Sequence, residues 1–216
     1  MEQGDRKGVA NTMKYYPINL DLRGKQCLVV GGGNVAARKV EGLVKAGANV
    51  TVLAPEVHPT IESVSHIHKD FEPEDVEGFF LVIAATSNAD TNKEVSLAAH
   101  KHGVLVNVVD DKDLSDFIVP SIVDCEPLTI SISTNGVAPF LSKQIRLELE
   151  SKYGKNYSNL LGLIKKHRQK IVSIQDKEKK ARIWKRIFSD EIFQSLENAD
   201  LSEIDLMIEG LIDGEE

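Results

Sequence analysis

Three consecutive glycines followed by small and polar residues form the most informative short segment of the sequence. Residues 31–36 read Gly-Gly-Gly-Asn-Val-Ala and fit the pattern G-x-G-x-x-G/A, with Ala36 in the third place. In that pattern Gly31 permits a tight turn, Gly33 lets a pyrophosphate approach the backbone, and a small Ala36 lets helix and sheet pack closely. Free N–H groups at the start of the next helix then face the phosphates. The segment predicts dinucleotide binding; the alternative is a glycine turn with a purely structural role.

Two neighbouring aspartates, Asp110 and Asp111, are the best candidates for acid–base chemistry. They directly follow an apolar run, and in an open α/β sheet ligands bind outside the carboxyl ends of the strands. One carboxylate would then face the reacting part of a cofactor and act as a base. The other interpretation is that both aspartates only cap or solvate a turn. The histidines are scattered, and the pair His66-x-His68 has no evident third ligand, so no metal site is predicted.

The end of the second predicted strand bears on the choice of cofactor. The acidic residue that usually holds the ribose is displaced, because Leu-Ala-Pro-Glu at 53–56 places Glu56 later than usual. No arginine lies nearby to bind a 2′-phosphate, so NAD is favoured over NADP. Thr86 follows the fourth predicted strand at the same edge, where a cofactor would pass.

The elements that must position these residues alternate between strand and helix. Helices are expected between the glycines and Gly47 and over 90–102, ending at Gly103. Strands are expected at 26–30, 49–53, 65–68, 79–85 and 104–109. Such alternation predicts an α/β fold with a doubly wound, Rossmann-type parallel sheet.

The pattern changes after this sheet. Strands are predicted at 117–123 and 128–133, joined by a turn at 124–127, and they form an antiparallel pair because no long helix separates them. From Ala138 onward the chain is predicted to be helical. Apolar stripes at helical spacing support this interpretation; they comprise Leu160, Leu161, Ile164, His167 and Ile171, and then Ile204, Met207, Ile208 and Leu211.

Composition limits the function classes. The chain has 216 residues, a formal net charge of −7 and a sequence pI near 5.4, which argues against general nucleic-acid binding. No apolar run is long enough to cross a membrane, and the first residues lack the apolar core of a secretory signal. Two cysteines cannot build a disulfide framework, so a cytoplasmic location is expected. Met13 is a candidate natural start, with residues 1–12 as a poorly ordered extension.

Charge is unevenly distributed near the end of the sequence. Residues 165–186 hold ten Lys or Arg against two acidic residues, whereas residues 187–216 hold ten Asp or Glu and no Lys or Arg. One interpretation is a set of solvated helix faces that pair with each other. The other is that the basic stretch attracts an anionic ligand.

Five ordered segments carry a resemblance to a known family. They are Pro17–Leu22, the run Val-Val-Gly-Gly-Gly-Asn-Val-Ala-Ala-Arg-Lys from Val29, Asn107–Asp110, Phe117–Ser121 and Ile132–Pro139. Over residues 14–216 the sequence resembles the precorrin-2 dehydrogenase of siroheme biosynthesis, including the N-terminal dehydrogenase/ferrochelatase portion of siroheme synthases. The resemblance implies an oxidoreductase that uses NAD to convert precorrin-2 to sirohydrochlorin, within porphyrin biosynthesis.

The same resemblance implies an architecture and an oligomeric state. It predicts an NAD-binding Rossmann domain over 13–112, a small β dimerisation region over 113–150 and a helical C-terminal domain over 151–216. The assembly would be an intertwined homodimer, with no nucleic acid or membrane as partner. The strand pair would be the dimerisation element.

Site residues also follow from the resemblance. The catalytic aspartate of the family falls on Asp110, which would act as the base or would orient the macrocycle through its pyrrole N–H groups. The cofactor positions fall on Asn34, Val35, Pro55 and Glu56. An anionic tetrapyrrole substrate also needs local cations, and the candidates are Lys143, Arg146 and the stretch 165–186. Asn135 and Gly136 precede the same helix, where they form a second anion site or simply a capped helix start.

Three questions stay open at this level. Some members of the family also insert ferrous iron into sirohydrochlorin, and the sequence shows no dedicated iron site. A non-enzymatic NAD-binding regulatory module would carry the same glycine turn without needing a carboxylate in the cleft. A dehydrogenase for small substrates would place a histidine, lysine or tyrosine at the strand edge, and none is evident.

Overall fold

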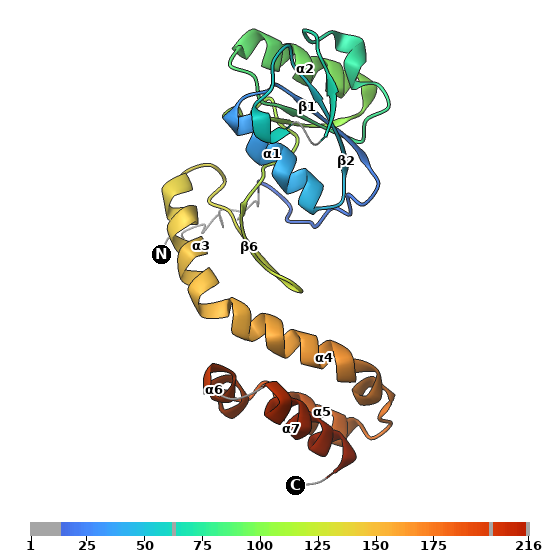
Figure 1. Cartoon of the computed structure of the whole chain (residues 1–216), viewed down its shortest axis with the longest axis vertical. Helices are drawn as coiled ribbons and strands as arrows, with labels where there is room; N and C mark the ends of the chain where they lie inside the picture. The colour runs from blue at the N-terminus through green and yellow to red at the C-terminus, as the bar shows by residue number, and fades with distance from the viewer. Residues whose placement is uncertain (1–13, 62–63, 199–200, 215–216) are drawn as a thin grey trace, which may run out of the picture. The chain divides into compact units, whose positions relative to one another are not determined.

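The computed structural model describes residues 14–61, 64–198 and 201–214. The chain forms two compact units that meet in sequence between Val119 and Pro120 (Figure 1). The prediction about Met13 and residues 1–12 lies outside the described residues. The three predicted domains, over 13–112, 113–150 and 151–216, stay a prediction.

Five parallel strands form the sheet of the first unit. They are β1 (Gln26–Val30), β2 (Asn49–Leu53), β3 (Ser65–Ile67), β4 (Leu81–Ala84) and β5 (Leu105–Val108), in the order β3-β2-β1-β4-β5. The chain crosses from β3 to β4 on the other side of β1, and this reversal is the doubly wound pattern. The Rossmann-type α/β fold predicted from the sequence is therefore confirmed.

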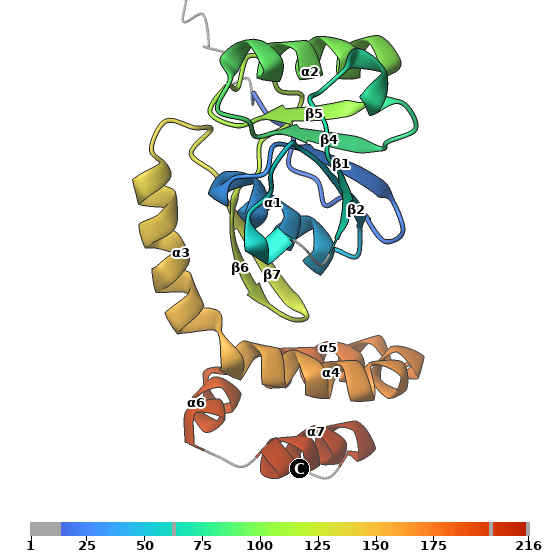
Figure 2. The same cartoon turned by 45° about the horizontal axis from the view of Figure 1, so that its top comes forward.

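Helices cover both faces of the sheet (Figure 2), and successive strand residues enter two separate cores, one on each face. Cys27 and Val29 pack with the helix α1 (Asn34–Lys45), whereas Leu28 and Val30 pack with α2 (Ala89–His102). The short 3₁₀ helices η1 (Pro59–Ile61) and η2 (Pro73–Val76) cover the α1 and α2 faces respectively. Burial on both faces explains why these strands are almost continuously apolar.

The ends of α2 are fixed by local chemistry that the sequence shows directly. The Asn88 side chain accepts hydrogen bonds from the Asp90 and Thr91 N–H groups at 2.9 and 3.2 Å, which satisfies two donors of the first turn. Gly103 ends the helix with a φ of +67°, a left-handed conformation that favours glycine. The predicted helix is confirmed within one residue at its start.

The second unit contains one hairpin and five helices within its described part. Strands β6 (Ser121–Cys125) and β7 (Leu128–Ile132) pair antiparallel. The helices are α3 (Pro139–Tyr153), α4 (Lys155–Ser173), α5 (Lys177–Ile187), α6 (Asp190–Asn198) and α7 (Leu201–Asp213). The two predicted apolar stripes, on α4 and α7, enter one core shared with α5 and α6. None of the helices in the described ranges is both long and apolar enough to span a membrane.

Two strands begin two or more residues later than predicted. The strand expected from residue 79 begins at Leu81, because the Phe79 N–H donates to the Val76 carbonyl in the turn that ends η2. The strand expected from residue 117 begins at Ser121, because the Phe117 carbonyl accepts a hydrogen bond from the Asn107 side chain at 3.0 Å. The predicted turn at 124–127 is also shorter, since β6 continues to Cys125.

Candidate functional site

The glycine turn after β1 lies against the turn after β4. Gly31 has a φ of +118°, and a side-chain Cβ there would lie 2.5 Å from the Ala85 carbonyl oxygen. Its N–H donates to the Leu53 carbonyl at 2.9 Å. Gly31 is therefore required for the tight turn, as the motif predicts.

Gly32 has a role that the motif does not assign. A Cβ at Gly32 would lie 1.9 Å from the Glu56 carbonyl oxygen, so the backbone of the turn touches the loop after β2. The His58 N–H donates to the Gly32 carbonyl at 2.7 Å and holds this contact. The contact brings the predicted cofactor residues Pro55 and Glu56, both exposed, next to the glycine turn.

Gly33 borders open space and precedes α1. A Cβ at Gly33 would meet no atom of the described chain within 4 Å, so this face of the turn is free to receive a group. No side chain of the described residues caps α1, and its first turn, which includes Asn34 and Val35, contains no acidic residue. Unsatisfied N–H groups and the positive end of the helix dipole remain there. This cradle fits the phosphates of a dinucleotide.

Thr86 is engaged within the turn that follows β4. Its hydroxyl donates to Asn92 Oδ1 at 2.7 Å and accepts from the Asn88 N–H at 3.1 Å. Asn92 is buried and also accepts from the Thr86 N–H at 3.1 Å. The side chain of Thr86 thus shapes the turn against which Gly31 packs, and a contact between Thr86 and a cofactor stays a prediction. Sequence analysis missed Asn92, because an asparagine within a helix carries no recognisable signal.

Asp110 and Asp111 have different roles although they are adjacent. Asp111 Oδ1 accepts from the N–H groups of Asp113 and Leu114 at 3.0 and 3.1 Å, so Asp111 caps the turn after β5. Asp110 is exposed and makes no hydrogen bond or ion pair with any described residue. It has a φ of +64°, an uncommon conformation for a residue with a side chain that often marks functional sites.

The free carboxylate and the glycine turn lie at the same edge of the sheet. The ladder of parallel hydrogen bonds continues past the strand ends, from Ala85 N–H to the Val30 carbonyl at 2.8 Å and from Val109 N–H to the Ala84 carbonyl at 2.9 Å. β5 is two strands from β1, about 10 Å at the usual strand spacing. A ligand that extends from the glycine turn across β4 would therefore reach Asp110.

The rings of His66 and His68 lie against each other at a tilt of 37°, beside the loop after β2. Their ring centroids are 3.9 Å apart, and His68 Nδ1 lies 3.3 Å from the Pro55 carbonyl oxygen. Among the described residues, no group of three or more His, Cys, Asp or Glu could hold a metal ion. The histidine pair lies beside the loop that carries Pro55 and Glu56.

The four predicted substrate-binding residues belong to the second unit. Asn135 and Gly136 have φ values of +53° and +79° and form the turn between β7 and α3. The Thr134 hydroxyl accepts from the N–H of Ala138, the residue before α3, at 3.1 Å, but no side chain of the described residues caps the first turn of the helix. On α3, Lys143 is exposed and Arg146 pairs with Glu150. Substrate binding by these residues stays a prediction.

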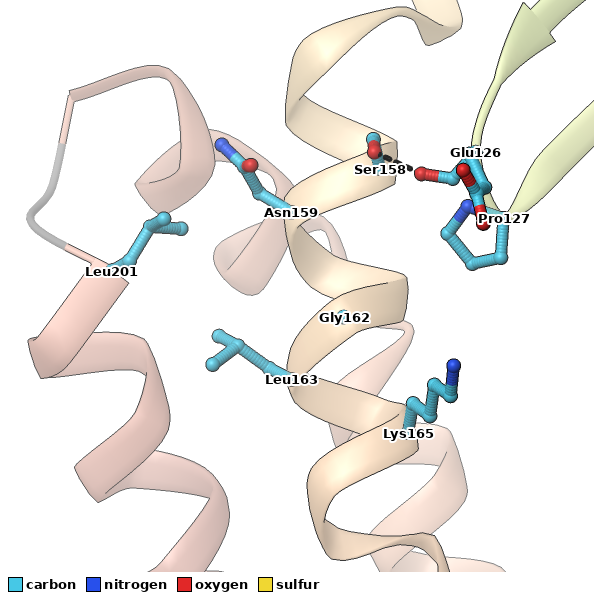
Figure 3. A pocket seen from close by; sticks show the side chains of 8 residues that line it. All are labelled: Glu126, Pro127, Ser158, Asn159, Gly162, Leu163, Lys165 and Leu201. Atoms are coloured by element: carbon cyan, nitrogen blue, oxygen red, sulfur yellow. Dashed lines mark hydrogen bonds between the residues drawn. The ribbon is translucent and has the colours of Figure 1, made fainter.

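An open pocket of about 420 Å³ lies in the second unit, beside α4 (Figure 3). The tip of the β6–β7 hairpin forms one wall, where the Ser158 hydroxyl donates to the Glu126 carbonyl. It is lined by Glu126, Pro127, Ser158, Asn159, Gly162, Leu163, Lys165 and Leu201. None of the residues predicted individually for the site lines this pocket, although Lys165 belongs to the basic stretch.

The basic stretch is partly neutralised by the acidic residues that follow it. Lys166 pairs with Asp205, Lys170 lies 3.7 Å from Glu209, and Arg186 pairs with Glu191. These contacts support the interpretation of helix faces that pair with each other.

Comparisons with known proteins agree with this geometry. Residues 18–121 match a family described as NAD(P)-binding, and residues 126–152 match one described as sirohaem biosynthesis protein central. The siroheme synthase of Methylobacillus flagellatus is 40% identical over 190 residues, which cover 85% of this chain and 40% of that protein. That of Thioalkalivibrio sulfidiphilus is 38% identical over 193 residues, again 85% of this chain and 40% of the relative.

The chain is a homologue of the siroheme synthases. It spans about 40% of the length of these curated relatives. The solved structure of SirC, a precorrin-2 dehydrogenase, superposes with a TM-score of 0.75 and 29% sequence identity, covering 90% of this chain and 99% of SirC. The family resemblance and the fold predicted from the sequence are both confirmed.

Proposed function

We propose that this siroheme synthase homologue uses NAD to oxidise precorrin-2 to sirohydrochlorin in siroheme biosynthesis. The observation that carries the proposal is the exposed, unengaged carboxylate of Asp110 at the sheet edge that also bears an open phosphate cradle at Gly33. SirC, which this chain matches over 99% of the length of SirC, is a precorrin-2 dehydrogenase. NAD is preferred over NADP because Glu56, next to the glycine turn, would repel a 2′-phosphate.

Each group at this edge has a defined task in such an oxidation. Bound NAD supplies the hydride acceptor. The N–H groups of Asn34 and Val35 at the start of α1 bind the pyrophosphate. The carboxylate of Asp110 takes the proton that the substrate loses when its hydride leaves.

In this proposal the second unit provides cations for the substrate, and two copies of the chain associate. Lys143 and Arg146 on α3 provide cations for an anionic tetrapyrrole, and two copies of the chain form a homodimer. The cytoplasmic location and the lack of a nucleic-acid partner stay predictions. Insertion of ferrous iron into sirohydrochlorin stays an open prediction.

Variants of the two aspartates test the proposal. NADH formation from precorrin-2 and NAD is followed for the wild type, Asp110→Ala, Asp110→Asn and Asp111→Ala. We expect D110A and D110N each to lower kcat about 100-fold or more, with the Kd for NAD unchanged. D111A is the matched control: it should lower the melting temperature, because two N–H groups lose their acceptor, and should keep most of the activity.

The outcomes separate the alternatives. Full activity in D110N together with loss in D110A would mean that Asp110 only accepts a hydrogen bond and orients the macrocycle. Activity unaffected in both would remove Asp110 from the mechanism. A folded wild type that binds NAD but forms no NADH would favour the non-enzymatic regulatory module.

A further inference from the structure

Lys39 is a half-buried cation on α1 that the proposed function leaves without a task. It follows Val35 by one helical turn, so the two residues share a face of α1. Val35 and Val109 pack against the same hydrophobic core, and Val109 leads directly into Asp110. This face of α1 and the segment that carries the free carboxylate therefore border the same core.

The electrostatic surroundings of Lys39 agree with this placement. The pKa of Lys39 is lowered, first by burial and then by the neighbouring charge of Arg38, while the charge of Asp110 acts in the opposite direction. The ammonium group is thus partly desolvated and within electrostatic reach of Asp110. Lys39 forms no hydrogen bond or ion pair with any residue in the described ranges. An unpaired, partly buried cation costs free energy that a bound anion would offset.

We propose that Lys39 binds a carboxylate of the anionic substrate beside Asp110 and so determines which part of the macrocycle reaches Asp110. The proposal rests on the proposed function and adds a specificity-determining residue to it. A phosphate of the cofactor is the other anion to test, because Lys39 shares a face of α1 with Val35, and the KM for NAD distinguishes the two.

Charge-neutral and charge-conserving variants of Lys39 test this role. Steady-state kinetics with precorrin-2 and NAD are compared for the wild type, Lys39→Met, Lys39→Gln and Lys39→Arg. We expect K39M and K39Q to raise the KM for precorrin-2 about tenfold to hundredfold, with kcat and the KM for NAD changed less than about threefold. K39R should restore most of the binding, since it keeps the charge.

A neighbouring residue provides the matched control. Arg38 is exposed and lies about 100° around the helix from Lys39, so Arg38→Met should leave the KM for precorrin-2 unchanged. Added salt should weaken substrate binding more in the wild type than in K39M, because one screened ion pair is already missing from the variant. Melting followed by circular dichroism shows whether K39M folds; if it does not, K39Q and K39R decide the question.

The possible results are distinct. A KM for precorrin-2 that stays at the wild-type value in K39M and K39Q would overturn the role of Lys39 alone. A raised KM for NAD with unchanged substrate binding would also overturn it. A wild-type chain that forms no NADH from precorrin-2 would remove the proposed function and this role with it.

Discussion

At the scale of single residues, the three consecutive glycines of the β1–α1 turn meet different surroundings. Gly31 faces the Ala85 carbonyl with a positive φ, and Gly32 touches the loop at Glu56. Gly33 borders open space and has a φ of −82°, which any residue can adopt. The first two glycines are therefore needed for the fold. The third, Gly33, is needed to leave room for a cofactor phosphate.

Alanine substitutions should separate the effect of these glycines on stability from their effect on NAD binding. Gly32→Ala should lower the free energy of unfolding by about 1–3 kcal/mol, because its Cβ overlaps the Glu56 carbonyl. Gly33→Ala should change the free energy of unfolding by less than about 0.5 kcal/mol and raise the Kd for NAD about tenfold. Urea unfolding measures the free energy of unfolding, and NAD titration measures the Kd. Equal loss of stability in the two variants would contradict this division.

The adjacent aspartates show where sequence analysis stops at this scale. The sequence placed both at a strand edge and left open whether they cap a turn or act on a ligand. Asp110 lies in a left-handed conformation within the turn in which the Asp111 N–H donates to the Val108 carbonyl at 3.2 Å. Asp111 then accepts from the N–H groups of Asp113 and Leu114, which follow it. The Ser115 hydroxyl donates to the Asp111 carbonyl at 2.6 Å and holds this turn. No short sequence pattern predicts that hydrogen bond.

At the scale of elements, periodicity predicted all five strands of the sheet and both of its long helices. It failed where a backbone group pairs with a distant side chain. Residues 117–120 are apolar enough for a strand. The Asn107 side chain, however, donates a hydrogen bond to the Phe117 carbonyl, which is then not paired in a strand. The contact between the backbones of Gly32 and Glu56 was also missed, because it joins residues far apart in the sequence.

The helices α4 and α7 are joined by a polar contact inside an apolar core. The side chain of His167 is 1% exposed, and its Nε2 lies 2.6 Å from Asp205 Oδ1. Asp205 also pairs with Lys166. The pKa of Asp205 is lowered from its usual value of 3.8, first by Lys166 and then by His167. The ionised carboxylate is thus the form that stabilises the helical unit.

The stability of this unit should depend on pH through Asp205. Because the pKa is lower in the folded state, the stabilisation is fully present above about pH 4 and is lost as the pH falls through the folded value. Urea unfolding followed by the fluorescence of Trp184, the single tryptophan and part of this core, should show this loss. Asp205→Asn should remove it.

A neighbouring acidic residue controls for general effects of acid. Glu203 is exposed on the same helix, so Glu203→Gln should keep the pH dependence of the wild type. A D205N variant whose urea midpoint falls with pH as steeply as that of the wild type would show that another group is responsible.

At the scale of the whole molecule, α3 and the turn before it expose several large apolar side chains. Val137 is 85% exposed and Phe140 is 73% exposed, and Leu141 and Leu147 are also exposed. Phe140 and Leu147 are two helical turns apart and so share a face of α3. Exposed apolar side chains that share a face often belong to an interface, and we expect this face to be buried in the proposed homodimer together with the predicted strand pair.

Charge placed on this surface should separate the two copies. We expect Phe140→Lys combined with Leu147→Lys to convert a dimer into a monomer in size-exclusion chromatography with light scattering, and to lower specific activity. Leu206→Lys is the matched control, because Leu206 is 67% exposed on α7, away from α3. A wild type that is already monomeric at micromolar concentration would contradict the proposed dimer.

The order of the elements along the chain has a consequence for synthesis. All five strands of the parallel sheet lie between Gln26 and Val108, and the first unit ends before β6 begins. During translation this unit is complete before any residue of α3 is added, and domains generally fold in that order. A nucleotide in the cell could then bind the glycine turn while the rest of the chain is still being synthesised. Such binding would stabilise the folded first unit against unfolding.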